Sequence, residues 1–228
     1  MLDFISGEVL LFDKPLYWTS FDLTKRVRGA IKQKLQIKKI KVGHAGTLDP
    51  MATGLMLICT GAATKKVEQY QELSKEYIAE IKLGATTPSY DCETEIDKTF
   101  ETEHITTEKL FEVADEFRGT FEQEPPLFSA KYVKGKRAYE FARKGTDIRL
   151  KTNLITIYEL EIINFQSPKL TLRVKCSKGT YIRALARDFG VKLNSGAFLT
   201  NLKRTAIGGY MLDKAMTFCE FENFLKIM

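Results

Sequence analysis

Hydrophobic and polar positions along the chain follow two periods, one typical of helices and one typical of strands. Apolar residues three and four positions apart predict a helix over 20–34, with Thr19 or Ser20 as its N-cap. Alternation of polar and apolar residues over 75–83 predicts a strand. The other predicted strands lie at 7–13, 55–60, 153–165 and 169–176, and the other predicted helices at 62–73, 106–117 and 179–193.

The order of these elements favours an α+β fold. Strands and helices are mixed without a regular βαβ rhythm, and a hairpin-like break at Ser167-Pro168 separates two of the strands. We therefore expect a mixed, mostly antiparallel central sheet flanked by helices and loops. The sequence has no internal repeat and no low-complexity linker, so it predicts a single domain over residues 1–228.

The composition is that of a globular protein. The chain has 228 residues, of which 44% are hydrophobic and 28% charged, and no apolar run approaches the roughly 18 residues of a membrane span. Asp3, Glu8 and Asp13 interrupt the apolar N-terminal segment and no basic region precedes it, so we expect no signal peptide. Four widely spaced cysteines are typical of reduced thiols, and together these features predict a cytoplasmic protein that does not bind a membrane.

The sequence lacks the common motifs of metal and nucleotide sites. His44 and His104 are too few for a histidine-rich metal site, and no cysteine pair has zinc-ligand spacing. Neither of the common phosphate-binding glycine loops is present, since there is no G-x-x-x-x-G-K-[ST] motif and no G-x-G-x-x-G motif after a strand. No G-x-S-x-G motif supports a Ser-His-Asp triad. We expect the chemistry to use ordinary side chains, with no metal and no cofactor.

Charge is strongly segregated behind a net charge of +6. Residues 23–48 contain eight basic residues and no acid, and further basic segments lie at 131–151 and 169–192. Residues 91–124 contain twelve acidic residues against three basic ones. Each basic run taken alone could be a solvated helix face. Three such runs beside one acidic segment favour a polyanionic partner, namely nucleic acid.

The segment 41–54 is the first candidate for chemistry. Gly43, Gly46 and Gly54 allow sharp turns or a close approach to a ligand. Asp49 precedes Pro50, which holds it out of a helix, so its carboxylate could stay ionised and reach a substrate. The structural alternative is that Asp49 only caps a turn.

Two further segments combine charge with aromatic residues. Arg183 lies at a strand-to-helix junction and could lower the pKa of a nearby carboxyl group, although its spacing also fits an exposed helix residue. Residues 123–139 interleave aromatic and basic side chains after a Pro-Pro stop, as RNA contacts require, although a plain hairpin with a solvated rim would also fit.

The segment Gly43–Pro50, with Ala52 and Gly54, resembles the signature motif of the TruB family of tRNA pseudouridine synthases. The resemblance covers nearly the whole chain. The other matching motifs are Asp13-Lys14-Pro15 followed by Trp18-Thr19-Ser20, Lys75-Glu76-Tyr77, residues 123–145, 176–183 and 196–199, and Leu202-Lys203-Arg204.

This resemblance implies an isomerase that converts uridine 55 in the TΨC loop of tRNA to pseudouridine after flipping the base, without metal or cofactor. It implies Asp49 as the catalytic carboxylate, Arg183 as its partner and Tyr77 as a proton acceptor. The residues that it implies at the target base are His44, Tyr77, Tyr181 and Leu202. It also implies the pseudouridine synthase fold, support of the catalytic loop by Lys14 and Pro15, and a thumb insertion at about 123–151 that grips RNA. We expect a monomer with the tRNA TΨC arm as its partner.

The sequence departs from the family pattern in three places. In the motif after the Tyr77 strand, Ser89 replaces a threonine and Thr94 replaces a glycine, and Glu124 stands where an aliphatic residue is common. The chain ends 19 residues after Gly209, so we expect no C-terminal PUA-type RNA-binding domain. Two alternatives stay open, namely a non-catalytic RNA-binding or tRNA-folding module and a synthase that acts on another RNA.

Overall fold

The computed structural model describes residues 2–129, 131–133, 135–142, 146, 148 and 150–228. The chain divides into two compact units, one formed by residues 1–77 and 202–228 and the other by residues 78–201. Strands β4 (Lys75–Leu83) and β12 (Ala197–Ile207) contribute residues to both units. The prediction of one domain stays a prediction.

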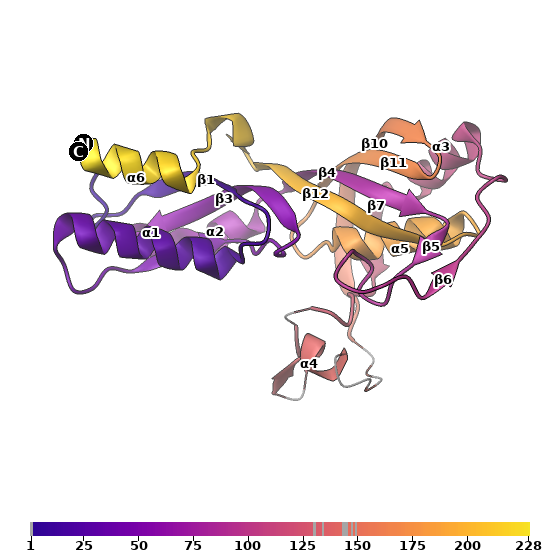
Figure 1. Cartoon of the computed structure of the whole chain (residues 1–228), viewed down its shortest axis with the longest axis horizontal. Helices are drawn as coiled ribbons and strands as arrows, with labels where there is room; N and C mark the ends of the chain where they lie inside the picture. The colour runs from indigo at the N-terminus through magenta and orange to yellow at the C-terminus, as the bar shows by residue number, and fades with distance from the viewer. Residues whose placement is uncertain (1, 130, 134, 143–145, 147, 149) are drawn as a thin grey trace. The chain divides into compact units, whose positions relative to one another are not determined.

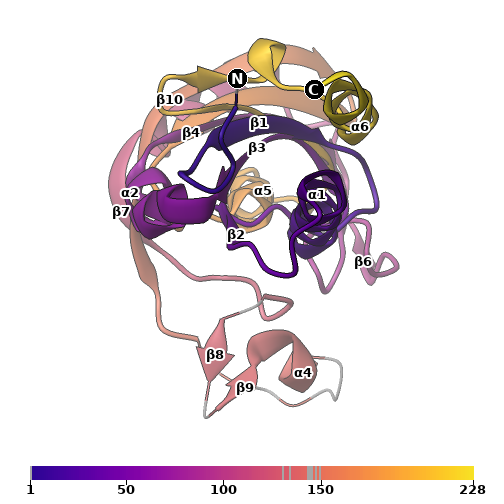
Figure 2. The same ribbon diagram turned by 90° about the vertical axis from the view of Figure 1, so that its left-hand side faces the viewer.

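The first unit is built on a small sheet with helices packed on it (Figures 1 and 2). Its strands are β1 (Val9–Lys14), β2 (Val42–Ala45), β3 (Ala52–Thr60), the end of β12 and β13 (Tyr210–Met211). Strand β3 pairs antiparallel with β1 and β2 and parallel with β12. The helices are α1 (Ser20–Leu35), the 3-10 turn η1 (Gly61–Lys66), α2 (Val67–Glu72), the 3-10 turn η2 (Leu212–Lys214) and α6 (Phe218–Ile227).

Two apolar layers hold this unit together. On one face, Leu55 and Leu57 of β3 pack with Ala45 and Ile207. On the other, the rings of Phe4 and Phe12 meet the edge of Phe221 in α6, with ring centroids 6.1 and 5.2 Å apart. Because β3 is covered on both faces, it reads as an almost continuous apolar run.

The second unit is an antiparallel sheet covered by two helices. Its strands follow the order β4-β11-β10-β7, with β7 (Gly119–Gln123), β10 (Asn153–Gln166) and β11 (Lys169–Cys176), and the two helices are α3 (Thr107–Glu116) and α5 (Ile182–Lys192). Phe117 stacks on Phe189 between the helices, with centroids 5.6 Å apart. The remaining elements are β5 (Ala85–Thr86), β6 (Lys98–Thr99), β8 (Tyr132–Val133), β9 (Lys136–Arg137) and α4 (Ala138–Ala142).

The predicted α+β class with a mostly antiparallel sheet is confirmed. The helix at 20–34 and the strand at 75–83 are found, and Gln166 faces Lys169 across the predicted hairpin. Some predicted boundaries were wrong, and β3 begins at Ala52 rather than at residue 55. The segment 62–73 is a 3-10 turn followed by a short helix, and α5 starts at Ile182, because Gly179 has a φ of +78°.

The predicted thumb at 123–151 lies partly outside the described residues. Within the described part, β8 and β9 pair antiparallel and α4 follows directly. The guanidinium carbon of Arg137 lies 3.8 Å above the ring of Tyr132. Among all described residues, no helix combines the length and the hydropathy that a bilayer crossing requires, and no three His, Cys, Asp or Glu side chains form a metal-type cluster.

Candidate active site

Asp49 lies on the loop between β2 and β3 of the first unit. The amide of Ala52 donates to the carbonyl of Asp49 at 3.0 Å and closes a turn with Pro50 at its second position. Gly46 and Gly54 have φ values of +93° and +105°, which favour glycine. Gly43 lies in β2 and does not have a positive φ. Two of the three predicted glycine turns are therefore found, one on each side of Asp49.

The start of α1 fixes this loop from one side. The hydroxyl of buried Ser20 donates to the carbonyl of Leu48 at 3.0 Å, and the amide of Leu48 donates back to the same hydroxyl at 2.8 Å. The amide of Tyr17 donates to the carbonyl of Pro50 at 2.8 Å. The residues on both sides of Asp49 are thus held by the segment before α1 and by its first turn.

A buried arginine fixes the loop from the other side. Arg204 of β12 is 1% exposed, and its guanidinium donates to the carbonyls of Leu55 at 2.7 Å and Gly46 at 3.1 Å. A Cβ on Gly54 would lie 2.3 Å from the backbone oxygen of Arg204, so only glycine allows β3 and β12 to pair here. The loop therefore depends on a residue more than 150 positions away in the sequence.

Lys14 adds a second buried cation beneath the loop. It is fully buried, and its ammonium group donates to the carbonyls of Pro15 at 2.9 Å and Trp18 at 2.6 Å. Burial lowers the pKa of Lys14 to about 8, the negative charge of Asp49 opposes that shift, and the positive charge of Arg204 adds to it. These couplings show that Asp49 lies in the field of a buried lysine and that Arg204 acts on the same lysine.

Three of the residues implied at the target base belong to the first unit. His44 lies in β2, with its ring nitrogens 3.2 Å from the hydroxyl of Thr24 and 3.3 Å from that of Thr47. Burial, followed by the charge of Arg204, lowers the pKa of His44, which favours a neutral ring at pH 7. Leu202 lies opposite Ala52 in the parallel pairing of β12 with β3, and Tyr77 is buried in β4.

Arg183 and Tyr181 belong to the second unit, at the beginning of α5. Arg183 is 5% exposed, so the alternative of an exposed helix residue is wrong. Within this unit its guanidinium lies 3.4 Å from a carboxylate oxygen of Asp91 and donates to the carbonyls of Ser89 at 3.3 Å and Phe128 at 3.0 Å. The pairing of Arg183 with Asp49 stays a prediction.

Two local arrangements hold the Arg183 region in place. The buried side chain of Gln123 accepts from the amide of Tyr181 at 2.8 Å and donates to its carbonyl at 3.1 Å. The hydroxyl of Thr94 accepts from the amide of Ser89 at 3.1 Å and lies 2.9 Å from its hydroxyl. The serine and threonine that depart from the family pattern therefore close the turn that carries Asp91.

Sequence comparisons give this geometry a context. A family model described as TruB family pseudouridylate synthase (N terminal domain) matches residues 32–182. The chain belongs to this family. It is 56% identical over 225 residues to a tRNA pseudouridine synthase B from Parabacteroides distasonis, covering 99% of this chain and 96% of the relative. It is also 49% identical to the protein of the same name from Flavobacterium johnsoniae, over 98% of both chains.

Solved structures support the same fold. The chain matches a protein of a Cbf5-Nop10-Gar1 complex with a TM-score of 0.72 and 26% identity, over 97% of this chain and 55% of that chain. It matches a structure of an H/ACA RNP bound to a substrate RNA containing 2'-deoxyuridine with a TM-score of 0.68 and 26% identity, over 97% of this chain and 54% of that chain. The chain thus spans about half the length of these two proteins.

Within this TruB family member, sequence reasoning missed three residues that support the site. Asp91, which lies between Ser89 and Thr94 in the motif after the Tyr77 strand, was not predicted as the partner of Arg183. Ser20 was considered only as an N-cap and Arg204 only as part of a motif, yet both hold the Asp49 loop. Their hydrogen bonds to Leu48 and Leu55 span 28 and 149 residues, and no local pattern signals such contacts.

Proposed function

We propose that this protein isomerises uridine 55 in the TΨC loop of tRNA to pseudouridine, with Asp49 as the catalytic carboxylate. Family membership supports the reaction type, and the names of relatives up to 56% identical support tRNA as the substrate. The observation that carries the assignment to Asp49 is a loop held by Ser20 and Arg204 around a single carboxylate, whose charge acts on buried Lys14. Such preorganisation is what a group that acts on a reacting bond requires.

The reaction exchanges one bond for another without loss or gain of atoms. The bond between N1 of uracil and C1′ of the ribose breaks, the base turns, C5 bonds to C1′, and a proton leaves C5 while N1 gains one. A carboxylate beside C1′ serves this chemistry either as a nucleophile or as a stabiliser of positive charge. We assign the carboxylate to Asp49, the proton acceptor to Tyr77, and the guanidinium that keeps the carboxylate ionised to Arg183.

The target base has to leave its stack before it can react, at a cost of a few kcal/mol. Stacking on an aromatic ring contributes about 1–3 kcal/mol per base and can offset that cost. We assign this role to Tyr77 and to the neutral ring of His44, with Tyr181 and Leu202 completing the pocket. In this scheme the chain's own residues do all of the chemistry.

The test is mapping of pseudouridine in tRNA from cells that lack this protein, complemented with wild type, Asp49→Asn or Asp213→Asn. Asp213 is an exposed acid of the same unit and serves as the control. We expect pseudouridine 55 to return with wild type and with the control, and to stay absent with Asp49→Asn, while the purified variant still binds tRNA.

The two alternatives give different results in the same experiment. If the protein were a non-catalytic tRNA-folding module, Asp49→Asn would complement the cells that lack it as well as wild type does. A synthase for another RNA would leave position 55 modified in the cells that lack the protein and would lose pseudouridine elsewhere. Either result would overturn the proposal.

A further inference from the structure

One face of α1 carries an aromatic residue followed by three cations, of which the first cation is exposed and the other two are half-buried. Phe21, Lys25, Arg28 and Lys32 are spaced by four, three and four residues, which places them along one stripe of a helix. The stripe spans about 16 Å at 1.5 Å per residue. None of these residues belongs to the catalytic set. Lys34, which is also exposed, lies on the opposite side of the helix.

The aromatic end of this stripe adjoins the Asp49 loop. Phe21 is 61% exposed and directly follows Ser20, whose hydroxyl holds Leu48. Tyr17 is 71% exposed, and its amide donates to the carbonyl of Pro50. Its φ of +67° lies in the left-handed region that residues with a side chain rarely adopt. A large ring displayed to solvent from a strained backbone beside a catalytic loop indicates a use for that ring.

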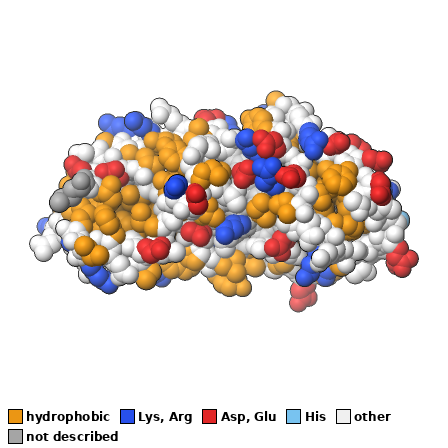
Figure 3. Space-filling model, turned by 90° about the horizontal axis from the view of Figure 1, so that it is seen from above, with side chains coloured by type: hydrophobic (Ala, Val, Ile, Leu, Met, Phe, Trp, Pro, Cys, Tyr) orange, Lys and Arg blue, Asp and Glu red, His pale blue; other side chains and the backbone are white. Residues whose placement is uncertain are grey.

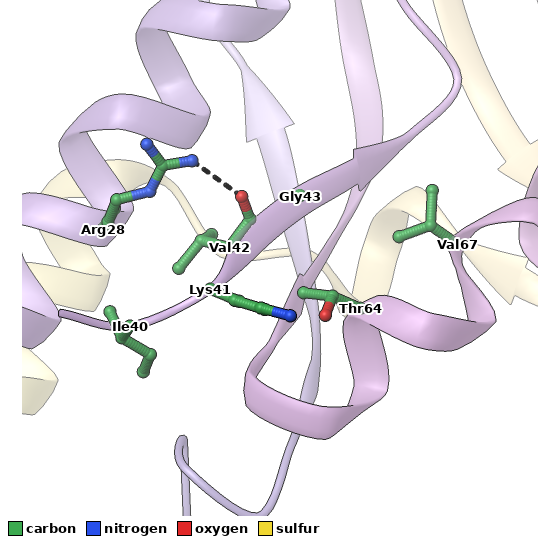
Figure 4. Close-up of a pocket in the computed structure, with 7 residues that line it drawn as sticks. All are labelled: Arg28, Ile40, Lys41, Val42, Gly43, Thr64 and Val67. Carbon is green, nitrogen blue, oxygen red and sulfur yellow. Dashed lines mark hydrogen bonds between the residues drawn. The ribbon is translucent and has the colours of Figure 1, made fainter.

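The basic end of the stripe leads into a groove. Arg28 and Lys41 line a groove of about 500 Å³ together with Thr64 and Val67 (Figure 4). One guanidinium nitrogen of Arg28 donates to the carbonyl of Val42 at 2.8 Å, which fixes the guanidinium at the groove wall. The side chain of Lys41 extends toward Thr64 in the same view, so two cations and a hydroxyl lie around one groove.

These cations have no close carboxylate partner among the described residues, although the hydrogen bond of Thr19 and, to a smaller extent, the charge of Lys25 lower the pKa of Asp22. Within the part of the chain that the structure describes, Lys25, Arg28, Lys32 and Lys41 form no ion pair. The cations of β11 in the second unit behave differently, since Arg173 and Lys175 pair with glutamates of β10. On the face shown in Figure 3, basic side chains are likewise dispersed among acidic ones. A row of unpaired cations beside exposed rings is the combination that binds an RNA strand.

We propose that Tyr17 and the stripe of Phe21, Lys25, Arg28 and Lys32, ending in the Arg28–Lys41 groove, form a second contact surface for the RNA substrate. The rings stack on bases next to the target loop, and the cations bind successive backbone phosphates. This inference rests on the proposed function only in taking tRNA as the ligand. The surface lies wholly within the first unit.

The test of the cations is the salt dependence of binding to an unmodified tRNA transcript, which requires no turnover. We expect Lys25→Gln with Lys32→Gln to reduce the slope of log K against log salt by about 1.5, from roughly 0.7–0.9 per lost phosphate contact. The matched control is Lys34→Gln with Lys38→Gln, which removes the same charge from exposed residues outside the stripe. Equal slopes for the two double variants would assign the effect to net charge and overturn the proposal.

The test of the rings separates a functional role from a structural one. We expect Tyr17→Gly to weaken tRNA binding about 5- to 150-fold, the equivalent of roughly 1–3 kcal/mol for a lost stack, while Tm stays the same or rises because strain is relieved. The control Phe111→Ala removes an exposed ring of α3. A lower Tm with unchanged tRNA affinity would identify Tyr17 as a packing residue and remove it from the surface.

Because the binding assays need no isomerisation, the two proposals fail separately. The catalytic proposal is tested by whether pseudouridine 55 is lost with Asp49→Asn and not with any control variant. A change of tRNA affinity only with the α1 variants, at unchanged kcat and raised KM, tests the surface. A lowered kcat with unchanged KM in the α1 variants would contradict a role in substrate binding.

Discussion

At the scale of single residues, Gly54 and Gly29 of the first unit differ in backbone conformation and in the space around them. Gly54 has a φ of +105°, and an added Cβ would lie 2.3 Å from the backbone of Arg204. Gly29 lies on the exposed side of α1 with nothing within 4 Å of an added Cβ. We expect Gly54→Ala to lower the free energy of unfolding by at least about 2 kcal/mol, from strain plus a clash. Gly29→Ala should raise it by about 0.5–1 kcal/mol.

Urea denaturation of the two variants checks this prediction, because the same added methyl group should move the midpoint in opposite directions. A stable Gly54→Ala protein with an unchanged midpoint would contradict the close pairing of β3 with β12. It would also show that Arg204 does not need that pairing to reach the Asp49 loop.

Buried Lys14 should make the free energy of unfolding depend on pH, and Lys14→Met should remove that dependence. Its pKa is about 8 in the folded protein and 10.5 in a free lysine, so the unfolded chain holds more protons between these values. The free energy of unfolding of the wild type should therefore rise with pH across this window, relative to that of Lys14→Met, by up to about 1.4 kcal/mol per pH unit. Below pH 8 the difference between the two proteins should be constant.

The measurement is urea denaturation of both proteins at intervals from pH 7 to 10.5. All other groups titrate in both proteins, so the difference isolates Lys14. Parallel pH profiles would mean that Lys14 keeps an ordinary pKa, and that the buried cation beside Asp49 is better solvated than its contacts indicate.

At the scale of elements, the first turn of α1 both begins a helix and holds the Asp49 loop. Thr19 is the N-cap in a capping box with Asp22, whereas Ser20 bonds the backbone of Leu48. We expect Thr19→Ala to cost about 1 kcal/mol of stability with little change in kcat. Ser20→Ala leaves buried polar groups of Leu48 unpaired, which costs about 1–3 kcal/mol. It should also lower kcat, because Asp49 is the next residue.

Single-turnover rates and urea midpoints of the two variants separate these effects. If both variants lose kcat in proportion to stability, the loop depends on the helix as a whole. If only Ser20→Ala loses kcat, the two hydrogen bonds to Leu48 position Asp49.

The elements that could be predicted from the sequence carry their signal locally. Helix α1 shows the apolar period and a capping box, and β4 shows alternation because only one of its faces is buried. Strand β2 was missed because its four residues lie in a glycine-rich segment and gain their partner only by pairing with β3. The segment 62–73 has helical spacing, but it divides into a 3-10 turn and a short helix.

At the scale of the whole molecule, the candidate site could be predicted only as far as motifs reach. Asp49 became a candidate because glycines and proline mark its loop, while its catalytic role came from the resemblance to the family motif and stays a prediction. Arg204 and Asp91 were not assigned, because the role of each depends on contacts about 90 to 150 residues distant. Long-range hydrogen bonds of a buried guanidinium leave no periodic signal, so their partners emerge only from the fold.

The catalytic proposal joins residues of both units, and a double-mutant cycle tests that link. Asp49 belongs to the first unit and Arg183 to the second, where its guanidinium lies 3.4 Å from Asp91. If Arg183 also keeps Asp49 ionised, the stability losses of Asp49→Asn and Arg183→Met should not add. We expect an interaction energy of about 0.5–3 kcal/mol from urea denaturation of the single and double variants.

Two further cycles calibrate the result. Asp91→Asn with Arg183→Met must show coupling, because these groups are in contact. Asp213→Asn with Arg183→Met should show none, because Asp213 is an exposed acid outside the proposed site. Coupling to Asp91 with none to Asp49 would assign the guanidinium to Asp91 alone. Lys14, the cation whose pKa responds to the charge of Asp49, would then be a better candidate than Arg183 for the partner of Asp49.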